Sequence, residues 1–137
     1  MVEKVEHFGP LVGRMLLSAI FIISGISKIF GWSGSSAYIA AKGMPLVSFF
    51  LLMALLLELL GGFSILVGFQ ARLSALALFL YLIPTTVIFH NFWASPAAQQ
   101  QLQMIMFLKN LAIMGGLAQL VAFGPASFSF DARKRRD

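Results

Sequence analysis

The sequence contains no cysteine among its 137 residues and only two histidines, His7 and His90. The absence of cysteine excludes disulfides, thiolate catalysis and cysteine-ligated metal clusters. A haem held between helices usually has two facing axial ligands, commonly histidines, and His7 lies in a polar N-terminal segment. We therefore expect no metal and no covalently bound cofactor.

Charge is also scarce. Asp, Glu, Lys and Arg make up 11% of the chain, whereas a soluble domain carries about a quarter. The net charge of +5 does not indicate a nucleic-acid partner, because much of it comes from the terminal cluster Arg133–Arg136. Hydrophobic residues make up 59% of the chain. This composition excludes a soluble enzyme and predicts a protein whose main partner is the lipid bilayer.

Four long apolar runs occupy most of the chain, at about residues 11–30, 46–69, 73–93 and 103–123. Each is near or above the ~20 residues that cross the hydrocarbon layer as a helix. A signal peptide is the alternative for the first run, but the three later runs and a poor cleavage site at Ala40-Ala41 disfavour it. We predict an all-α polytopic membrane protein in which residues 1–137 form one domain, a bundle of four transmembrane helices.

The basic residues are shared unequally between the two sides of the predicted membrane. Four spans put both termini on one side, whose basic residues are Lys4, Arg14, Arg72 and those of the tail 131–137. The other side has Lys28 and Lys42, together with Lys109 when it is assigned to its nearer end. The positive-inside rule then predicts that both termini are cytoplasmic. The basic tail also suits anionic lipid headgroups.

The second run, Leu46–Phe69, has a single charge, Glu58, close to its middle. A carboxylate near the midplane of a bilayer is costly unless it is neutralised, paired or turned toward a polar cavity. Lys109 in the fourth run lies at a depth that two long side chains can bridge. We therefore predict a Glu58–Lys109 pair, with Asn110 as a further partner. A purely structural ion pair is the alternative that these residues leave open.

Each run has one polar or small-residue face. In the first run, Arg14, Ser18, Gly25 and Lys28 fall within a stripe about 80° wide. Glycine on a helix face lets another helix approach closely. We therefore assign structural roles to Arg14, Gly61, Gly62, Gly115 and Gly116.

The polar side chains of the half of the bundle away from the termini are predicted to surround one small ligand cavity. The candidate ligand-binding residues are Lys28, Glu58, His90, Lys109 and Asn110. Three alternatives stay open: Lys28 extends to the membrane surface, His90 is an ordinary interface residue, and Arg14 is an anchor at the lipid headgroups.

Short motifs in a fixed order resemble those of the DoxX family, over about residues 10–131. They are Gly13-Arg14, Ser24-Gly25, Ser27-Lys28, Ala41-Lys42-Gly43-Met44-Pro45, Glu58-Leu59-Leu60-Gly61-Gly62, Phe89-His90-Asn91-Phe92-Trp93, Phe107-Leu108-Lys109-Asn110 and Gly115-Gly116. The resemblance implies a small four-span protein of the bacterial inner (plasma) membrane, of a kind often labelled oxidoreductase. The family name is linked to the small subunit of a thiosulfate:quinone oxidoreductase, and some members are described as membrane anchors in redox-stress complexes with soluble enzymes.

Three functions follow as hypotheses. The first is a membrane component of a redox or oxidative-stress system, with a quinone in the predicted cavity and a soluble redox enzyme as partner. That partner is needed because the chain has no flavin or dinucleotide fingerprint, so catalysis by the chain alone is not expected. The second is a non-catalytic scaffold for a soluble partner. The third is transport of a small solute or a proton, for which four spans would require a homo-oligomer.

Overall fold

The computed structural model of the protein describes residues 2–134. Arg135, Arg136 and Asp137 of the predicted basic tail lie outside the described residues. Over residues 2–134 the structure is helical without strands, which confirms the all-α prediction. The helices are α1 (Val2–Phe30), α2 (Trp32–Ala41), α3 (Val47–Val67), α4 (Ala71–Phe89), the 3₁₀ turn η1 (Phe92–Ala94), α5 (Ala97–Phe123) and α6 (Phe130–Lys134).

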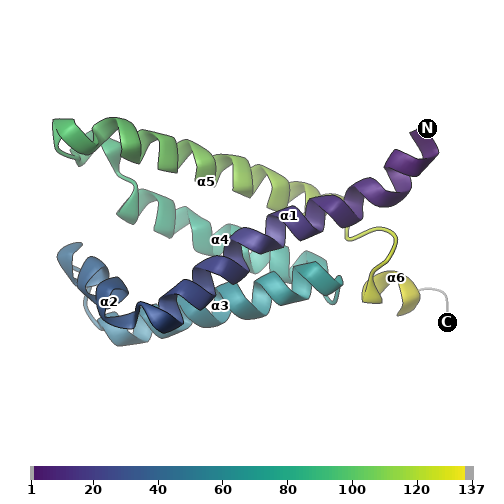
Figure 1. Ribbon diagram of the computed structural model, residues 1–137, viewed down its shortest axis with the longest axis horizontal. Coiled ribbons are helices and arrows are strands. Elements are labelled where there is room, and N and C mark those ends of the chain that lie inside the picture. The colour runs from purple at the N-terminus through teal and green to yellow at the C-terminus, as the bar shows by residue number, and fades with distance from the viewer. Residues whose placement is uncertain (1, 135–137) are drawn as a thin grey trace.

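Four of these helical segments are long and apolar enough to cross a membrane: α1, α3, α4 with its extension to Ala94, and α5. Figure 1 shows them running along the long axis of the molecule, with both chain ends and the turn between α3 and α4 at the same end. We call this the terminal end, and the opposite end, which carries α2 and η1, the loop end. The predicted four-span arrangement is confirmed.

The helices extend further than the apolar runs predict. α1 begins at Val2 rather than near residue 11 and continues through Pro10, and α5 begins at Ala97 rather than near residue 103. The added residues include Glu, Lys and Gln, which are good helix formers, so backbone hydrogen bonding continues beyond the apolar stretch. In contrast, α4 ends at Phe89, before the predicted residue 93.

The core lies where the four long helices meet, and its largest fully buried side chains include Ile65, Leu78 and Leu117. α1 and α3 approach closely at Gly62, where an added Cβ would lie 3.3 Å from the backbone nitrogen of Ile22. Gly61 faces α4 instead, because its Cβ would lie 2.9 Å from the Leu78 side chain. The two adjacent glycines therefore let α3 pack against two different neighbours.

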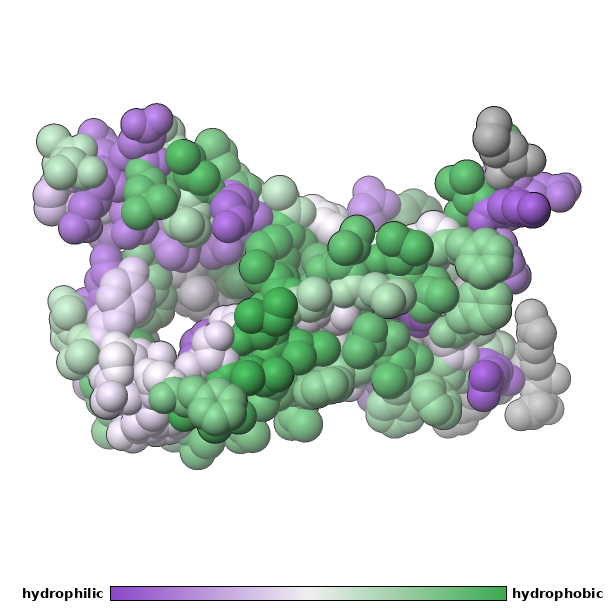
Figure 2. Space-filling view, in the orientation of Figure 1, coloured by the Kyte–Doolittle hydropathy of each residue, from purple (hydrophilic) through white to green (hydrophobic). Residues whose placement is uncertain are grey.

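The outer surface of the bundle carries large apolar side chains that are exposed, including Leu16, Phe63, Leu80 and Ile105. Figure 2 shows a hydrophobic middle of the molecule, with hydrophilic residues gathered toward the two ends. Such a surface is suited to contact with lipid chains along its middle and with water or headgroups at its ends.

Candidate functional site

A buried ion pair joins α1 to α3. Lys28 Nζ lies 2.9 Å from Oε1 and 2.7 Å from Oε2 of Glu58, whose side chain is almost completely buried. Lys28 Nζ also donates to Ser24 Oγ at 2.7 Å, and the Tyr81 hydroxyl of α4 donates to Glu58 Oε1 at 2.8 Å. Charge-assisted hydrogen bonds of this kind offset the cost of placing a carboxylate in a medium of low dielectric constant. The Glu58 cluster, defined as Ser24, Lys28, Glu58 and Tyr81, thus links three helices.

The predicted pairing of Glu58 with Lys109 is wrong, because the partner of Glu58 is Lys28. The close approach at Gly25 and Gly62 brings α1 directly against the face of α3 that carries Glu58. From Gly25, Lys28 is one turn further along the same face, so its side chain reaches the carboxylate. The alternative in which Lys28 only extends to the membrane surface is corrected by the same contact.

Tyr81 is, with Ser24, one of the two members of the cluster that sequence reasoning missed. Its aromatic ring in an apolar run is typical of ordinary packing. The available signal was its hydroxyl, because a buried tyrosine O–H usually requires an acceptor and Glu58 is an acceptor in the neighbouring span.

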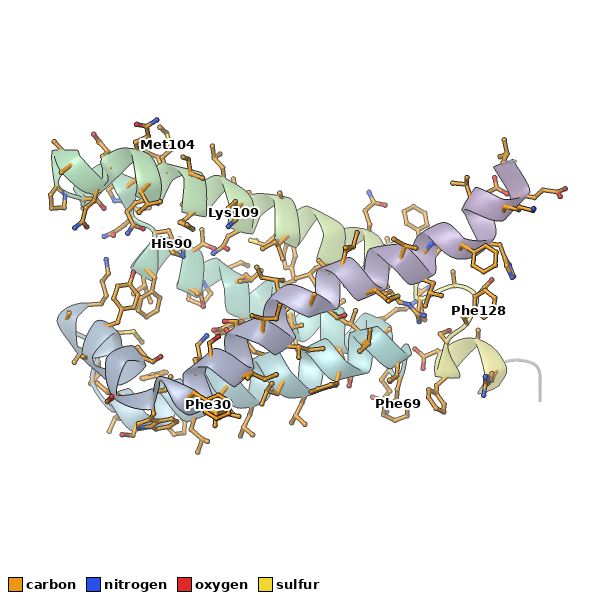
Figure 3. All side chains as sticks on the ribbon, in the orientation of Figure 1. Phe30, Phe69, His90, Met104, Lys109 and Phe128 are labelled. Atoms are coloured by element: carbon orange, nitrogen blue, oxygen red, sulfur yellow. The ribbon has the colours of Figure 1, made fainter. Side chains whose placement is uncertain are left out.

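Two of the other predicted cavity residues, His90 and Asn110, are bonded to residues other than Glu58, so the predicted set does not meet around Glu58. His90 Nδ1 lies 2.9 Å from Gln103 Oε1, and Asn110 Nδ2 donates to Thr86 Oγ1 at 3.0 Å. Both contacts connect the α4 side of the bundle with α5. In Figure 3, His90 lies at the end of α4 and Lys109 in the middle of α5.

Two side-chain hydrogen bonds connect α2 and the residue that follows it to the end of α4 across the loop end. The Tyr38 hydroxyl donates to the Phe89 carbonyl at 3.2 Å, and Lys42 Nζ lies 3.3 Å from Asn91 Oδ1. Figure 2 shows the surface hollowed at this end of the molecule. The loop end is therefore bridged by polar contacts rather than filled by apolar packing.

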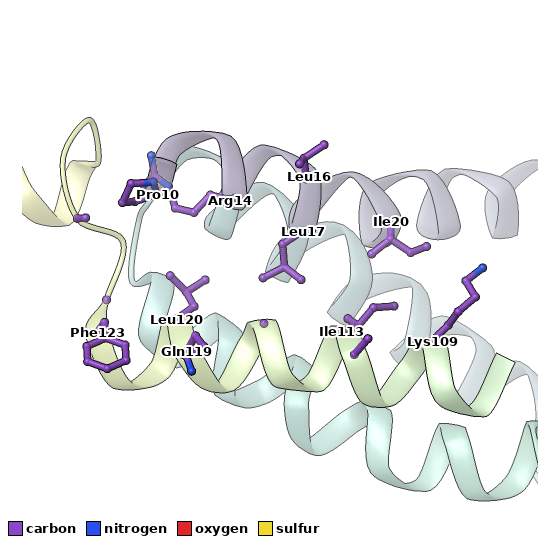
Figure 4. A pocket seen from close by; sticks show the side chains of 15 residues that line it. Pro10, Arg14, Leu16, Leu17, Ile20, Lys109, Ile113, Gln119, Leu120 and Phe123 are labelled. Atoms are coloured by element: carbon purple, nitrogen blue, oxygen red, sulfur yellow. The ribbon is translucent and has the colours of Figure 1, made fainter. Parts of the chain in front are cut away.

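A largely apolar groove of about 750 Å³ lies between α1 and α5. Leu17 and Ile20 form part of its α1 wall, and Lys109, Ile113 and Gly116 form part of its α5 wall. Figure 4 shows the side chains of Leu17 and Ile20 facing those of Lys109 and Ile113 across the groove, with Phe123 toward the terminal end. Lys109 and Gly116 share a face of α5, so the fourth span combines a cation with a small-residue surface.

Lys109 makes no ion pair or hydrogen bond with any of residues 2–134. At about 1.5 Å per residue it lies about 9 Å inside the apolar run that begins near residue 103, and about 21 Å before the end of α5. A cation at that depth is costly without a partner. The Lys109 ammonium, with three N–H donors, is therefore a group in the groove that requires an acceptor, as is the buried guanidinium of Arg14 at its terminal end.

The predicted structural roles of Arg14 and the fourth-span glycines have different outcomes. Arg14 is 3% exposed and donates from Nη2 to the Phe128 carbonyl at 2.8 Å, so it is buried against the C-terminal segment. A Cβ on Gly116 would lie 3.4 Å from Leu17 across the groove. Gly115 faces open space, with nothing within 4 Å of an added Cβ, so no close helix contact depends on it.

Comparison with known proteins gives two family matches. The family model described as DoxX matches residues 9–91, and the model of the SURF4 family matches residues 62–136. Inner membrane protein YqjF of Escherichia coli (strain K12) is 38% identical over 129 residues, covering 94% of each chain. Inner membrane protein YphA of the same organism is 32% identical over 123 residues, covering 90% of this chain and 88% of its own.

More distant similarity reaches eukaryotic proteins. The Surfeit locus protein 4 homolog of Drosophila melanogaster is 26% identical over 137 residues, which is 98% of this chain but 44% of the longer protein. No solved structure matches this chain. The DoxX match contains the whole Glu58 cluster, whereas Lys109 and the rest of α5 lie in the SURF4 match.

Proposed function

This chain belongs to the DoxX family, and from that membership together with the groove between α1 and α5 we propose that it is a quinone-binding component of a redox system in the bacterial inner membrane. In this proposal both termini are cytoplasmic and a partner enzyme supplies the electrons. The quinone would supply two-electron chemistry coupled to protons, while the chain binds and orients it.

The observation that carries the proposal is the depth of Lys109 in an apolar groove. A phospholipid phosphate is charged and stays at the membrane surface, whereas Lys109 lies about 9 Å inside the apolar run at about 1.5 Å per residue. A quinone headgroup is neutral and can enter the hydrocarbon layer. Its carbonyl oxygens accept hydrogen bonds from the ammonium, and its isoprenoid tail matches the apolar walls.

The bonds within the Glu58 cluster support the assignment of Lys109 as the ligand-binding residue. Lys28, Glu58 and Tyr81 satisfy one another and join α1, α3 and α4, which favours a structural role for the ion pair. His90 and Asn110 are likewise bonded within the protein. Among the five candidate ligand-binding residues, Lys109 is therefore the one that lines the groove and makes no bond within residues 2–134.

The test is the thermal stability of the purified protein in detergent with a short-chain quinone analogue. Ligand at ~100 times its dissociation constant should raise the free energy of unfolding by about 2.7 kcal/mol. Lys109→Met should abolish the shift, because it removes the donor and keeps the length of the side chain. Lys109→Arg should retain part of it.

A matched pair of glycine variants tests the location of the ligand. Gly116→Leu should block quinone binding, because Gly116 lines the groove opposite Leu17. Gly115→Leu makes the same change one residue away, where an added Cβ meets nothing, and should leave the quinone shift intact. Equal responses of the two variants, or no shift with any quinone, would overturn the proposal and leave the scaffold function in its place.

A further inference from the structure

The C-terminal segment, residues 124–131, folds back onto the turn between α3 and α4. Asp131 Oδ1 accepts a hydrogen bond from the backbone N–H of Gln70 at 2.8 Å, and Oδ2 accepts one from Ala71 at 2.9 Å. The Asp131 N–H donates in return to the Gly68 carbonyl at 3.0 Å. A carboxylate from the end of the chain thus occupies the N-terminus of α4, where the free N–H groups and the helix dipole favour an anion.

Beside this carboxylate lies the buried guanidinium of Arg14. Its Nη2 atom donates to the Phe128 carbonyl, but Nε and Nη1 are buried and have no acceptor within the described part of the chain. A Cβ on Gly68 would overlap both Arg14 Nη1 and Ser129 Cβ, so the guanidinium is enclosed between the turn and the C-terminal segment. Buried donors of a charged group that remain unpaired are strongly unfavourable.

The segment that encloses Arg14 has a strained backbone. Ala126 has φ of 54° and Phe128 has φ of 55°, both in the left-handed region that residues with a Cβ seldom adopt. Such strain persists only where surrounding contacts override it. Here those contacts are the bonds of Arg14 and Asp131 and the packing of the Phe128 ring on His7 and Phe8, so loss of the Asp131 bonds should loosen the segment.

We propose that Arg14 and the N-terminus of α4 form a binding site for the phosphate of an anionic lipid headgroup, one without a neighbouring ammonium, and that Asp131 occupies this site from within the chain. A phosphate group has more acceptor oxygens than a carboxylate and can pair with Nε or Nη1 of Arg14, which Asp131 leaves unpaired. The site lies at the terminal end, beside Phe69 and Phe128, where a span meets the headgroup layer (Figure 3). A second guanidinium is close, because Arg72 Nε would lie 3.0 Å from a Cβ on Gly124.

The phosphate site and the proposed quinone position at Lys109 lie at different depths, although Arg14, Gly124 and Ala126 also line the terminal end of the groove. Lys109 lies deep in α5, whereas the phosphate site involves the α3–α4 turn and the C-terminal segment at the terminal end. Binding of a lipid phosphate displaces Asp131 and releases the segment. A failure of quinone binding therefore leaves this proposal standing.

The experiment measures the distance between the turn and the C-terminal segment by electron paramagnetic resonance. The chain has no cysteine, so Phe69→Cys and Phe130→Cys introduce two unique spin-label positions, at side chains that are 53% and 58% exposed. In nanodiscs of phosphatidylcholine a short, narrow distance peak is expected. Added phosphatidylglycerol should reduce that peak, and Asp131→Asn should reduce it without anionic lipid.

Variants separate this site from a general effect of surface charge. Arg14→Gln should abolish the response to phosphatidylglycerol, and Arg14→Lys should weaken it if the first variant does not fold. Arg133→Gln removes an exposed cation of the same segment, which lies over the Phe130 ring in the native chain, and should leave the response intact. Loss of the response in Arg133→Gln but not in Arg14→Gln or Arg14→Lys would overturn the proposal.

Inorganic phosphate added to phosphatidylcholine nanodiscs distinguishes the source of the anion. No effect of free phosphate together with a clear effect of phosphatidylglycerol supports a lipid ligand. An equal effect of free phosphate overturns the assignment to a lipid, and a distance peak unchanged by either anion overturns the site itself.

Discussion

At the scale of residues, the Glu58–Lys28 pair makes a prediction about folding. Losing one partner of a buried ion pair leaves an uncompensated charge and costs ~3–5 kcal/mol, whereas replacing both can be nearly neutral. Lys28→Met and Glu58→Gln should each lower the unfolding temperature in detergent, and the double variant should recover much of the loss. Lys109→Met is the control, because it removes a lysine without breaking a contact of the described residues. Harmless single variants would show that the pair is not formed.

Tyr81 gives a second residue-scale prediction. Tyr81→Phe keeps the ring and removes the hydrogen bond to Glu58 Oε1. A hydrogen bond to a charged group contributes about 1.5–3 kcal/mol, so the variant should be destabilised, but less than Glu58→Gln. Comparison of the two melting curves checks the order. A Tyr81→Phe variant as stable as the native chain would mean that the Lys28 ammonium alone satisfies the carboxylate.

The sequence shows that Glu58 needs a partner but does not identify which lysine supplies it. Depth along a span can be estimated from residue number, and both Lys28 and Lys109 are within reach on that measure. The choice depends on which helix packs against the Glu58 face of α3. Gly25 and Gly62 provide that contact, and neither glycine alone specifies the other as its neighbour.

At the scale of elements, the crossing of α1 and α3 depends on Gly62. Gly62→Ala places a Cβ 3.3 Å from the Ile22 backbone nitrogen and 2.9 Å from the Ile22 side chain. Overpacking of this kind typically costs 1–3 kcal/mol, and it also weakens the Glu58–Lys28 contact at the same interface. A lower unfolding temperature is therefore expected for this variant.

Gly115→Ala is the matched control for this crossing. It lies in α5 and faces open space, so the higher helix propensity of alanine should leave its stability equal or raised. Comparable losses in Gly62→Ala and Gly115→Ala would contradict the role of the crossing.

The elements themselves follow well from the sequence, except at their ends. The apolar runs reveal where lipid contact is required, but a helix continues for as long as its backbone bonds are satisfied. Residues 2–10 and 97–102 are too polar to be counted in an apolar run, but they are helical in the structure. The groove between α1 and α5 is not predictable in this way, because it depends on how closely two helices distant in the chain approach.

At the scale of the whole molecule, the unequal numbers of basic residues at the two ends of the bundle predict its orientation in the membrane. The structure places both chain ends and the α3–α4 turn at one end of the bundle (Figure 1). That end carries Lys4, Arg14, Arg72 and Arg133, and the loop end carries Lys28 and Lys42. Because cytoplasmic segments are enriched in Lys and Arg, the terminal end should be cytoplasmic.

Reporter fusions test this orientation. Fusions after Gly34, Arg72, Ser95 and the C-terminus should report outside, inside, outside and inside, in that order. The matched comparison is between the two ends of α4, since fusions after Arg72 and Ser95 differ by that one span. An external C-terminal fusion would place the Arg14 site in the outer leaflet. The anionic lipid proposed for that site would then be one of the outer leaflet.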